Sequence, residues 1–104
     1  MNNKMEDKNI NDLEVRKKIV CGSIVVKLYT PPLKQRYNRN ITGENIYGDI
    51  LWQIDDVHPI NDSPFTNIMP FDDEKIEAYN WDGCYYYIRI SDGKIEFIPN
   101  QRPW

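Results

Sequence analysis

The sequence predicts a small, mainly β domain, and three features of the chain support this prediction. Its 104 residues suffice for one hydrophobic core but not for two. Aromatic residues, which favour strands, make up 12% of the chain, and short alternating apolar and polar runs recur along it. Turn-forming glycines separate several of these runs. We therefore expect a single antiparallel meander of about seven or eight short strands, folded as a twisted sheet, a half-barrel or a propeller-like blade.

The chain divides into a polar N-terminal tail and one domain. Residues 1–13 show no apolar periodicity, so we expect a flexible tail or a short helix there, followed by a β domain over residues 14–104. The N-terminus has no apolar core of a secretory signal, and no run approaches the roughly 18 apolar residues of a membrane span. These features predict a cytoplasmic protein that does not enter a membrane.

The first two predicted strands lie close together in the sequence. Ile19–Cys21 and Ser23–Tyr29 flank Gly22, a pattern that is typical of a hairpin. Pro31 then ends the second strand, because proline cannot donate to a ladder of hydrogen bonds. The polar residues 34–43 are expected to form a loop.

Two further hairpins follow the same pattern of a β run, a glycine-containing turn and a second β run. Alternation and turn residues define them. The first comprises Asn45–Tyr47, a Gly48–Asp49 turn and Ile50–Ile54, and the second comprises Cys84–Ile90, a Ser91–Gly93 turn and Lys94–Ile98.

The segment between these hairpins begins with a loop over Asp55–Pro64, rich in aspartate, asparagine and proline. A short strand near Thr66–Met69 and a strand over Lys75–Tyr79 follow it. A turn at Asp82–Gly83 then leads into the second hairpin.

Strand alternation also predicts which side chains form the core. The more apolar face of each strand carries Ile50, Trp52, Ile54, Tyr86, Ile88, Ile95 and Phe97. Trp81 lies in a turn, and we expect it to fold back over one end of the core, although protrusion as a contact residue is the alternative. Cys21 and Cys84 are expected to be buried free thiols in a reducing compartment.

One strand carries an unusual pair of faces. Opposite Tyr86 and Ile88, the same strand presents Tyr85, Tyr87 and Arg89, residue types that are enriched at binding hot spots. If this face is exposed, it is a candidate contact surface. The alternatives are that a loop or the N-terminal segment covers it, or that both faces of the sheet are buried.

Charge is distributed unevenly along the chain, although the formal net charge is only −3. Residues 1–39 hold nine bases and four acids, whereas residues 49–79 hold eight acids and one base. The acidic block disfavours nucleic-acid binding and favours a basic protein partner, unless it is simply a solvated face that keeps the protein soluble. The candidate partner-binding acids are Asp55, Asp56, Asp62, Asp72, Asp73 and Glu74.

The sequence carries no recognisable catalytic, metal-binding or cofactor motif. His58 is the single histidine and lies in a predicted loop, where we expect it to be solvated. The carboxylates of Asp55 and Asp56, like those of Asp72 and Asp73, are adjacent and point apart on an extended backbone. We therefore expect neither an enzyme nor a bound metal or cofactor.

Several segments resemble small bacterial immunity-type proteins encoded near polymorphic toxins. They are Asn45–Tyr47, Ile50–Asp55, Ser63–Thr66 and Ala78–Gly83. The resemblance implies a role such as that in contact-dependent growth inhibition, where a cytoplasmic protein neutralises a delivered toxin, for example a basic nuclease.

Two functions therefore remain open. The first is an immunity-type protein that binds a toxin domain through its acidic loops and through Tyr85, Tyr87, Arg89 and Trp81. The second is a small ligand-binding β module that stacks carbohydrate on exposed aromatic rings. The sequence leaves the oligomeric state open.

Overall fold

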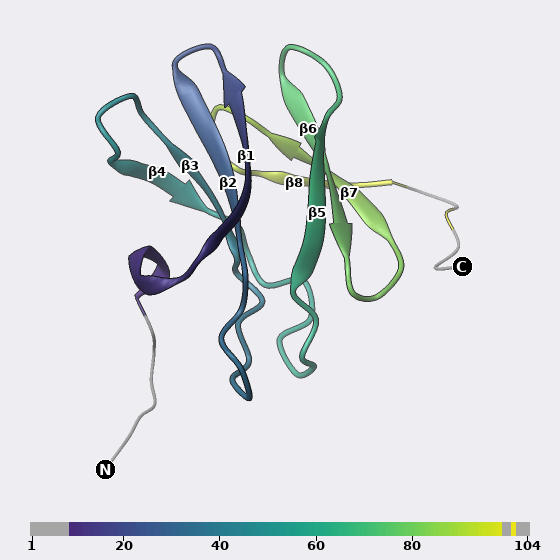
Figure 1. The fold of residues 1–104 in the computed structure, drawn as a ribbon. Coiled ribbons are helices and arrows are strands. Elements are labelled where there is room, and N and C mark those ends of the chain that lie inside the picture. Colours follow the sequence, from purple (N-terminus) through teal and green to yellow (C-terminus); the bar gives the residue numbers. More distant parts are fainter. Residues whose placement is uncertain (1–8, 99–100, 102–104) are drawn as a thin grey trace.

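Two four-stranded antiparallel sheets pack face to face in the computed structural model, which describes residues 9–98 and Gln101 (Figure 1). Sheet A has the order β1-β2-β3-β4 and sheet B the order β5-β6-β7-β8. The elements are η1 (Ile10–Asp12), β1 (Val15–Cys21), β2 (Ile24–Tyr29), β3 (Ile41–Glu44), β4 (Ile50–Gln53), β5 (Phe65–Pro70), β6 (Lys75–Asn80), β7 (Tyr85–Arg89) and β8 (Ile95–Phe97).

The predicted β class is confirmed, but the prediction of a single meander is wrong. The eight strands form two successive meanders, and the connection between β4 and β5 passes from one sheet to the other. Each sheet has one apolar face, and packing the two faces together removes both from water. A single open sheet would leave its apolar face exposed.

The N-terminal helix turn covers part of the outer face of sheet A. Ile10 and Leu13 pack against Tyr29, which alternation directs away from the central core. The Tyr29 hydroxyl donates to buried Glu44, and the Lys27 ammonium lies 3.0 Å from the same carboxylate. Residues 1–8 of the predicted tail, and residues 99, 100 and 102–104 of the predicted domain, lie outside the described residues.

The β3–β4 hairpin differs from the prediction. The incoming strand is β3, so part of the predicted loop 34–43 is a strand, and predicted strand Asn45–Tyr47 is the hairpin loop. Asn45 explains the difference, because its side-chain oxygen accepts the backbone N–H groups of Tyr47 and Asp49. An asparagine that bonds its own following backbone bends the chain into a turn.

The other predicted strands agree closely with the structure. β2 and β4 to β8 each begin and end within one residue of the predicted bounds, and β1 begins four residues earlier than predicted. Gly48 and Gly83 adopt positive φ values of 87° and 88° in the predicted turns. Local alternation and turn chemistry are therefore sufficient to locate most strands.

The core draws side chains from both sheets. Its buried members are Val26, Leu28, Ile41, Trp52, Ile54, Phe65, Ile68, Ile76, Ala78, Tyr86, Ile88 and Ile90. Four of the predicted core residues are thus confirmed, and Ile95 packs against this cluster while only partly buried.

Ile50 and Phe97 were wrongly predicted to be core residues, since both are exposed, Phe97 by 70%. A bulge places Trp52 opposite Gly43 but Ile50 opposite Glu44. This shift turns Ile50 to the outer face, because moving the register by one residue exchanges the two faces of a strand. Phe97 lies on the edge strand β8, where no further strand covers it.

The indole of Trp52 joins the two sheets at one end of the core. Its Nε1–H donates to the carbonyl oxygen of Ile90 at 2.8 Å, across the interface between the sheets. A Cβ added to Gly43 would lie 2.2 Å from Trp52 Cε2, and one added to Gly93 would lie 2.5 Å from Cδ2. The ring therefore fits between two stretches of bare backbone, one from each sheet.

Buried asparagines join the sheets near the long loops, at the lower end in Figure 1. The Asn40 amide donates to the carbonyl oxygens of Tyr29 and Phe65, and its own oxygen accepts the N–H of Phe65. Asn38 accepts the N–H of Ser63 in the same way. These side chains bond backbone groups at the end of β2, at the start of β5 and in the connection just before β5, and so join the two sheets.

Removing the Trp52 side chain should strongly destabilise the fold. We expect Trp52→Ala to lower the free energy of unfolding by about 3–5 kcal/mol, measured by urea denaturation. Trp81→Ala is the matched control, because this side chain is 72% exposed and should change stability by less than about 0.5 kcal/mol. Equal effects of the two substitutions would contradict the described role of Trp52.

Gly43→Ala tests the close contact itself. We expect a loss of about 1–3 kcal/mol in the wild-type protein, because the new methyl group overlaps the indole. The same substitution should cost much less in the Trp52→Ala background, where the overlapping atoms are absent. A double-mutant cycle measures this coupling, and additive effects would show that the ring does not restrict this position.

Candidate functional site

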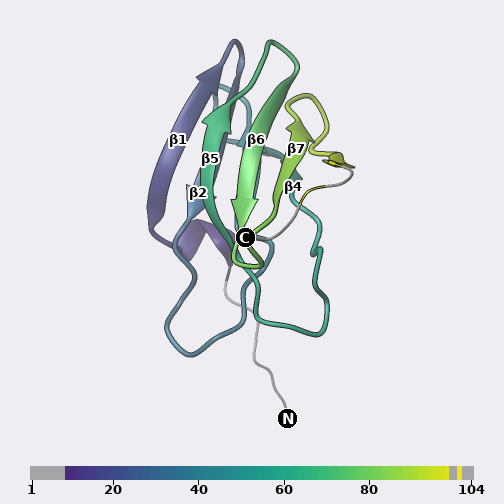
Figure 2. The same ribbon diagram turned by 90° about the vertical axis from the view of Figure 1, so that its right-hand side faces the viewer.

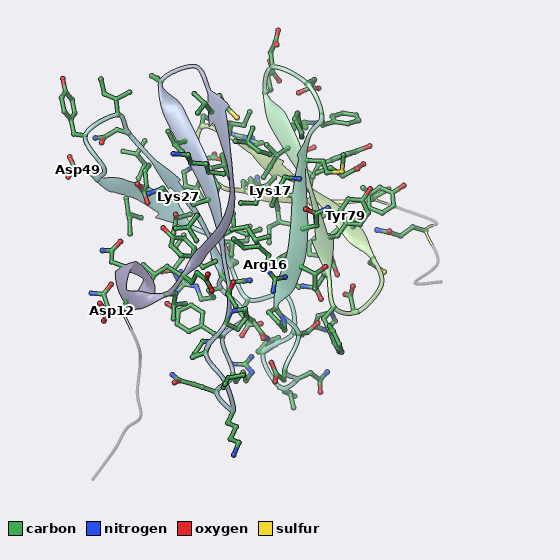
Figure 3. The ribbon with its side chains drawn as sticks, viewed as in Figure 1. Asp12, Arg16, Lys17, Lys27, Asp49 and Tyr79 are labelled. Atoms are coloured by element: carbon green, nitrogen blue, oxygen red, sulfur yellow. The ribbon has the colours of Figure 1, made fainter. Side chains whose placement is uncertain are left out.

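The outer face of sheet B is built by the alternation of β6 and β7. Tyr79 pairs with Tyr85 across the two strands, and Glu77 pairs with Tyr87. Because the alternating residues Ala78 and Tyr86 face the core, these side chains point away from it. Figure 3 shows Tyr79 on the side of sheet B that faces away from sheet A.

Four aromatic side chains form a continuous group on this surface. The rings of Tyr79 and Tyr85 stack with their centroids 5.5 Å apart. Phe71, from the β5–β6 turn, packs on Tyr87 at 4.3 Å. We call Phe71, Tyr79, Tyr85 and Tyr87 the aromatic face. The tyrosines are half-buried by these mutual contacts and Phe71 is exposed, so the rings are held in position yet remain accessible.

Charged side chains surround the aromatic face. Lys75 Nζ lies 5.6 Å from the centre of the Tyr87 ring and 2.7 Å from Glu96 Oε1. The hydrogen bond with Glu96 raises the pKa of Lys75, and a hydrogen bond to Glu77 raises the pKa of Tyr79. Both groups therefore stay protonated at neutral pH, so the surface carries the Lys75 ammonium and the neutral Tyr79 phenol.

The aromatic face is open in the described part of the chain. Figure 2 turns this side of the molecule toward the viewer, and none of the described strands lies in front of β5, β6 and β7. Gln101 binds at the edge, where its amide donates to the Tyr85 carbonyl and accepts the Tyr85 N–H. Among the described residues, no loop and no second sheet covers these strands. Residues 1–8 of the N-terminal segment, the other predicted cover, lie outside the described residues.

The six predicted acidic residues do not form one surface. Asp55, Asp56 and Asp62 lie on the connection between β4 and β5, whereas Asp72, Asp73 and Glu74 form the turn between β5 and β6. Strand β5 separates the two groups, which lie at opposite ends of sheet B (Figure 1). The second group adjoins the aromatic face, because Phe71 belongs to the same turn.

Two of these acids have structural partners. The Asp56 carboxylate accepts hydrogen bonds from Asn38 and Arg36. Burial alone would raise the pKa of Asp56, but these bonds and one from the His58 backbone outweigh it and lower the pKa. Asp72 Oδ1 accepts the N–H groups of Glu74 and Lys75 and so closes its turn.

The other acids of the set are exposed to solvent. Next to the aromatic face, an open groove of about 480 Å³ carries both signs of charge. It is lined by Ile24, Asp73, Glu74, Lys75, Arg89, Ile90, Ser91 and Glu96.

Trp81 protrudes from the β6–β7 turn, so the expectation that it folds over the core is wrong. Its backbone N–H donates to the Pro64 carbonyl, and Asn80 accepts the N–H of Asp82. These bonds hold the turn while the indole projects outward. Trp81 lies beyond the end of the strands that carry the aromatic face.

His58 is engaged in a cluster that the sequence did not reveal. Its Nε2 lies 2.5 Å from Asp82 Oδ2, and the same oxygen accepts the Tyr86 hydroxyl at 2.6 Å. Burial alone would raise the pKa of Asp82, but the bonds from Tyr86 and His58 lower it. Burial and the Asp82 carboxylate raise the pKa of Tyr86. The two loops that carry His58 and Asp82 are 24 residues apart, so no local pattern could have indicated this contact.

The described residues contain no group of three or more histidine, cysteine, aspartate or glutamate side chains that could hold a metal ion. Cys21 and Cys84 are free and half-buried, and burial raises the pKa of both thiols. Both side chains pack against the core. In the described part of the chain, no helix is long and apolar enough to cross a membrane.

The cluster around Asp82 predicts a pH-dependent contribution to stability. We expect Asp82→Asn to cost about 1–3 kcal/mol at pH 7, because the carboxylate accepts a phenolic hydrogen bond and faces His58. The pKa of Asp82 in the folded protein lies below its ordinary value of 3.8. The carboxylate therefore stabilises the fold above pH 3.8, and this stabilisation is lost as the pH falls through the lower folded-state pKa.

Denaturation of wild type and Asp82→Asn between pH 7 and pH 3 measures this effect. The difference in unfolding free energy should shrink toward the acidic end. A difference that is constant over the whole range would show that the Asp82 charge is not its source.

The comparisons with known proteins give one match. No curated protein and no solved structure matches the chain. A family model described as a domain of unknown function, DUF7957, matches residues 6–98, which include both sheets and the aromatic face. The chain therefore belongs to the DUF7957 family.

Proposed function

We propose that this protein is an immunity-type inhibitor that binds a basic partner protein, a cognate toxin domain, through the aromatic face of sheet B. The observation that carries the proposal is the open row of Tyr79, Tyr85 and Tyr87 beside an acidic turn. Tyrosine is enriched among the residues that dominate binding energy in protein interfaces.

The position of the aromatic face on the sheet supports tight binding. β6 and β7 are the two inner strands of sheet B, so their backbones are held on both sides. Contacts between the rings further restrict their side chains before any partner binds. Such a surface loses little conformational entropy on association, which leaves more of the contact energy for affinity.

The acidic turn supports a basic partner. Asp73 and Glu74 are exposed next to the aromatic face, and Asp72 lies between them and Phe71. Opposite charges on two surfaces accelerate their encounter and orient them, whereas the apolar centre determines how long they stay together. The acids at the far end of sheet B would contribute less to this steering.

Carbohydrate binding is the second candidate function. The stacked rings of Tyr79 and Tyr85, inclined by 29°, form a platform of the kind on which a sugar ring can pack. A neutral sugar would depend on the rings but not on the acidic turn. Charge-neutralising variants therefore distinguish the two candidates.

Substitutions in the aromatic face should weaken the complex by speeding its dissociation. We expect Tyr85→Ala and Tyr87→Ala each to raise the dissociation rate by about tenfold or more, which corresponds to about 1.4 kcal/mol. The assay combines surface plasmon resonance with growth rescue during co-expression of a candidate basic toxin domain. Leu33→Ala is the control, because Leu33 is an exposed apolar residue on the loop before β3.

Neutralising acids at the two ends of sheet B tests the steering. We expect the double variant Asp73→Asn, Glu74→Gln to slow association, most strongly at low salt, because exposed charges are screened over about 8–10 Å at physiological ionic strength. The matched double variant Asp55→Asn, Asp62→Asn removes the same charge at the far end and should have the smaller effect.

The outcomes separate the surface from the role. Equal effects of both acidic pairs, together with unchanged dissociation of the tyrosine variants, would place the contact elsewhere. Saccharide binding that depends on the tyrosines, with no toxin rescue, would overturn the immunity role.

A further inference from the structure

The β3–β4 hairpin exposes a group of large apolar side chains at the free edge of sheet A. Ile46 is 68% exposed and Tyr47 is 83% exposed, and Ile50 and Leu51 continue the exposed group along β4. This hairpin projects at the upper left in Figure 1, and Asp49 marks its tip in Figure 3. Contiguous exposed apolar side chains of this kind mark interaction sites.

The hairpin loop is held rigidly in this exposed conformation. Asn45 Oδ1 accepts the N–H groups of Tyr47 and Asp49 at 2.9 and 3.0 Å, and its Nδ2 donates to the Asp49 carboxylate. The backbone N–H of Asn45 also donates to the Asp49 carbonyl. Ile46 and Tyr47 cannot fold back against the sheet without breaking these hydrogen bonds. The bonds therefore fix the loop in the conformation that exposes both side chains.

β4 lacks the charges and the proline that are found on the edge strands β1 and β5. The outer strands of the two sheets are β1, β4, β5 and β8. β1 carries Arg16, Lys17 and Lys18, and β5 ends at Pro70, which cannot donate to a ladder. β4 has the sequence Ile-Leu-Trp-Gln, with neither a charge nor a proline. Charges and prolines are the usual protection of an edge against pairing with another chain.

A groove of about 560 Å³ lies near the opposite end of the same strand. Its lining residues are Asn9, Ile10, Arg36, Tyr37, Asn38, Arg39, Gln53 and Asp56. Arg36 pairs with Asp56, and Arg39, whose Nε donates to the Ile54 carbonyl oxygen, supplies the further positive charge of this lining. The groove is therefore mostly polar, with a net positive charge, and includes Tyr37 and Ile10.

We propose that a second copy of this chain covers this edge, with the β3–β4 hairpin of each protomer seated in the groove of the other. A two-fold axis beside β4 aligns the two β4 strands antiparallel. That alignment brings the tip of one hairpin to the end of the partner strand where the groove lies. Each contact then forms twice, as a two-fold interface requires.

Charge and shape are complementary in this arrangement. In this arrangement, Asp49 at the tip approaches the positive groove, and the exposed Tyr47 lies near Tyr37 and Ile10 of its lining. The bulge between β3 and β4 interrupts a regular ladder along the edge. The contact therefore relies on side chains rather than on a continuous sheet across the two copies.

The dimer leaves the aromatic face of sheet B free on both copies, since β4 belongs to sheet A. One dimer would thus present two equivalent binding surfaces. This inference does not depend on the proposed function, because it concerns a different sheet and a different partner.

Sedimentation velocity of the full chain, over loading concentrations from about 1 μM to 1 mM, tests the dimer. We expect a mass that rises with concentration from 12.4 kDa to twice that value. Tyr47→Ser and Ile46→Ser should each raise the dimer dissociation constant by about tenfold or more. Val20→Ser is the matched control, because Val20 on β1 has the same 68% exposure as Ile46 and should leave the constant unchanged.

Exchanging two charges tests whether the hairpin of one copy binds in the groove of the other. Asp49→Lys and Arg39→Glu should each weaken the dimer, whereas the double variant should restore it, with melting curves showing that all variants are folded. A monomer at every concentration would overturn the proposal. So would a Val20→Ser effect equal to that of Ile46→Ser, or a double variant that is no tighter than the weaker single variant.

Discussion

The Trp52 indole is the contact on which the relative placement of the two sheets depends. No hydrogen-bonded strand pair connects sheet A with sheet B in the described chain, so side chains alone hold them together. The indole donates to the Ile90 carbonyl and fits against Gly43 and Gly93. At the other end, Asn40 connects the two sheets through backbone groups. Because contacts at both ends of the core hold the two sheets together, the outer faces of the sheets are not needed to close the core.

The two sheets differ in the charged residues that they carry. Four bases of the N-terminal part, Arg16, Lys17, Lys18 and Lys27, lie on β1 and β2 of sheet A, and three of them are labelled in Figure 3. Lys27 pairs with Glu44, and Lys17 donates to Asn67 on β5. The acidic turn of sheet B lies next to the aromatic face. The acidic turn therefore favours the approach of a basic partner to sheet B. The proposed second copy uses the β4 edge, so the two proposed contacts do not compete.

The candidate site was predictable in part because its central residues lie on one strand. Tyr85, Tyr87 and Arg89 share a face by simple alternation, and the structure places them on that face. Phe71 and Tyr79 join them only because β5, β6 and β7 are neighbours in one sheet. The acidic residues lie close in sequence but divide between the two ends of β5, which no count of charges could reveal.

The sequence by itself determined most of the local structure of this protein: every strand except β3, most of the alternating faces and the turns at glycine. These features depend on interactions between residues that are close along the chain. The tertiary structure decided that the meander divides into two sheets, that Phe97 is exposed, and that His58 meets Asp82. Each of these outcomes depends on contacts between segments far apart in the sequence, where burial of two apolar faces, rather than local preference, sets the arrangement.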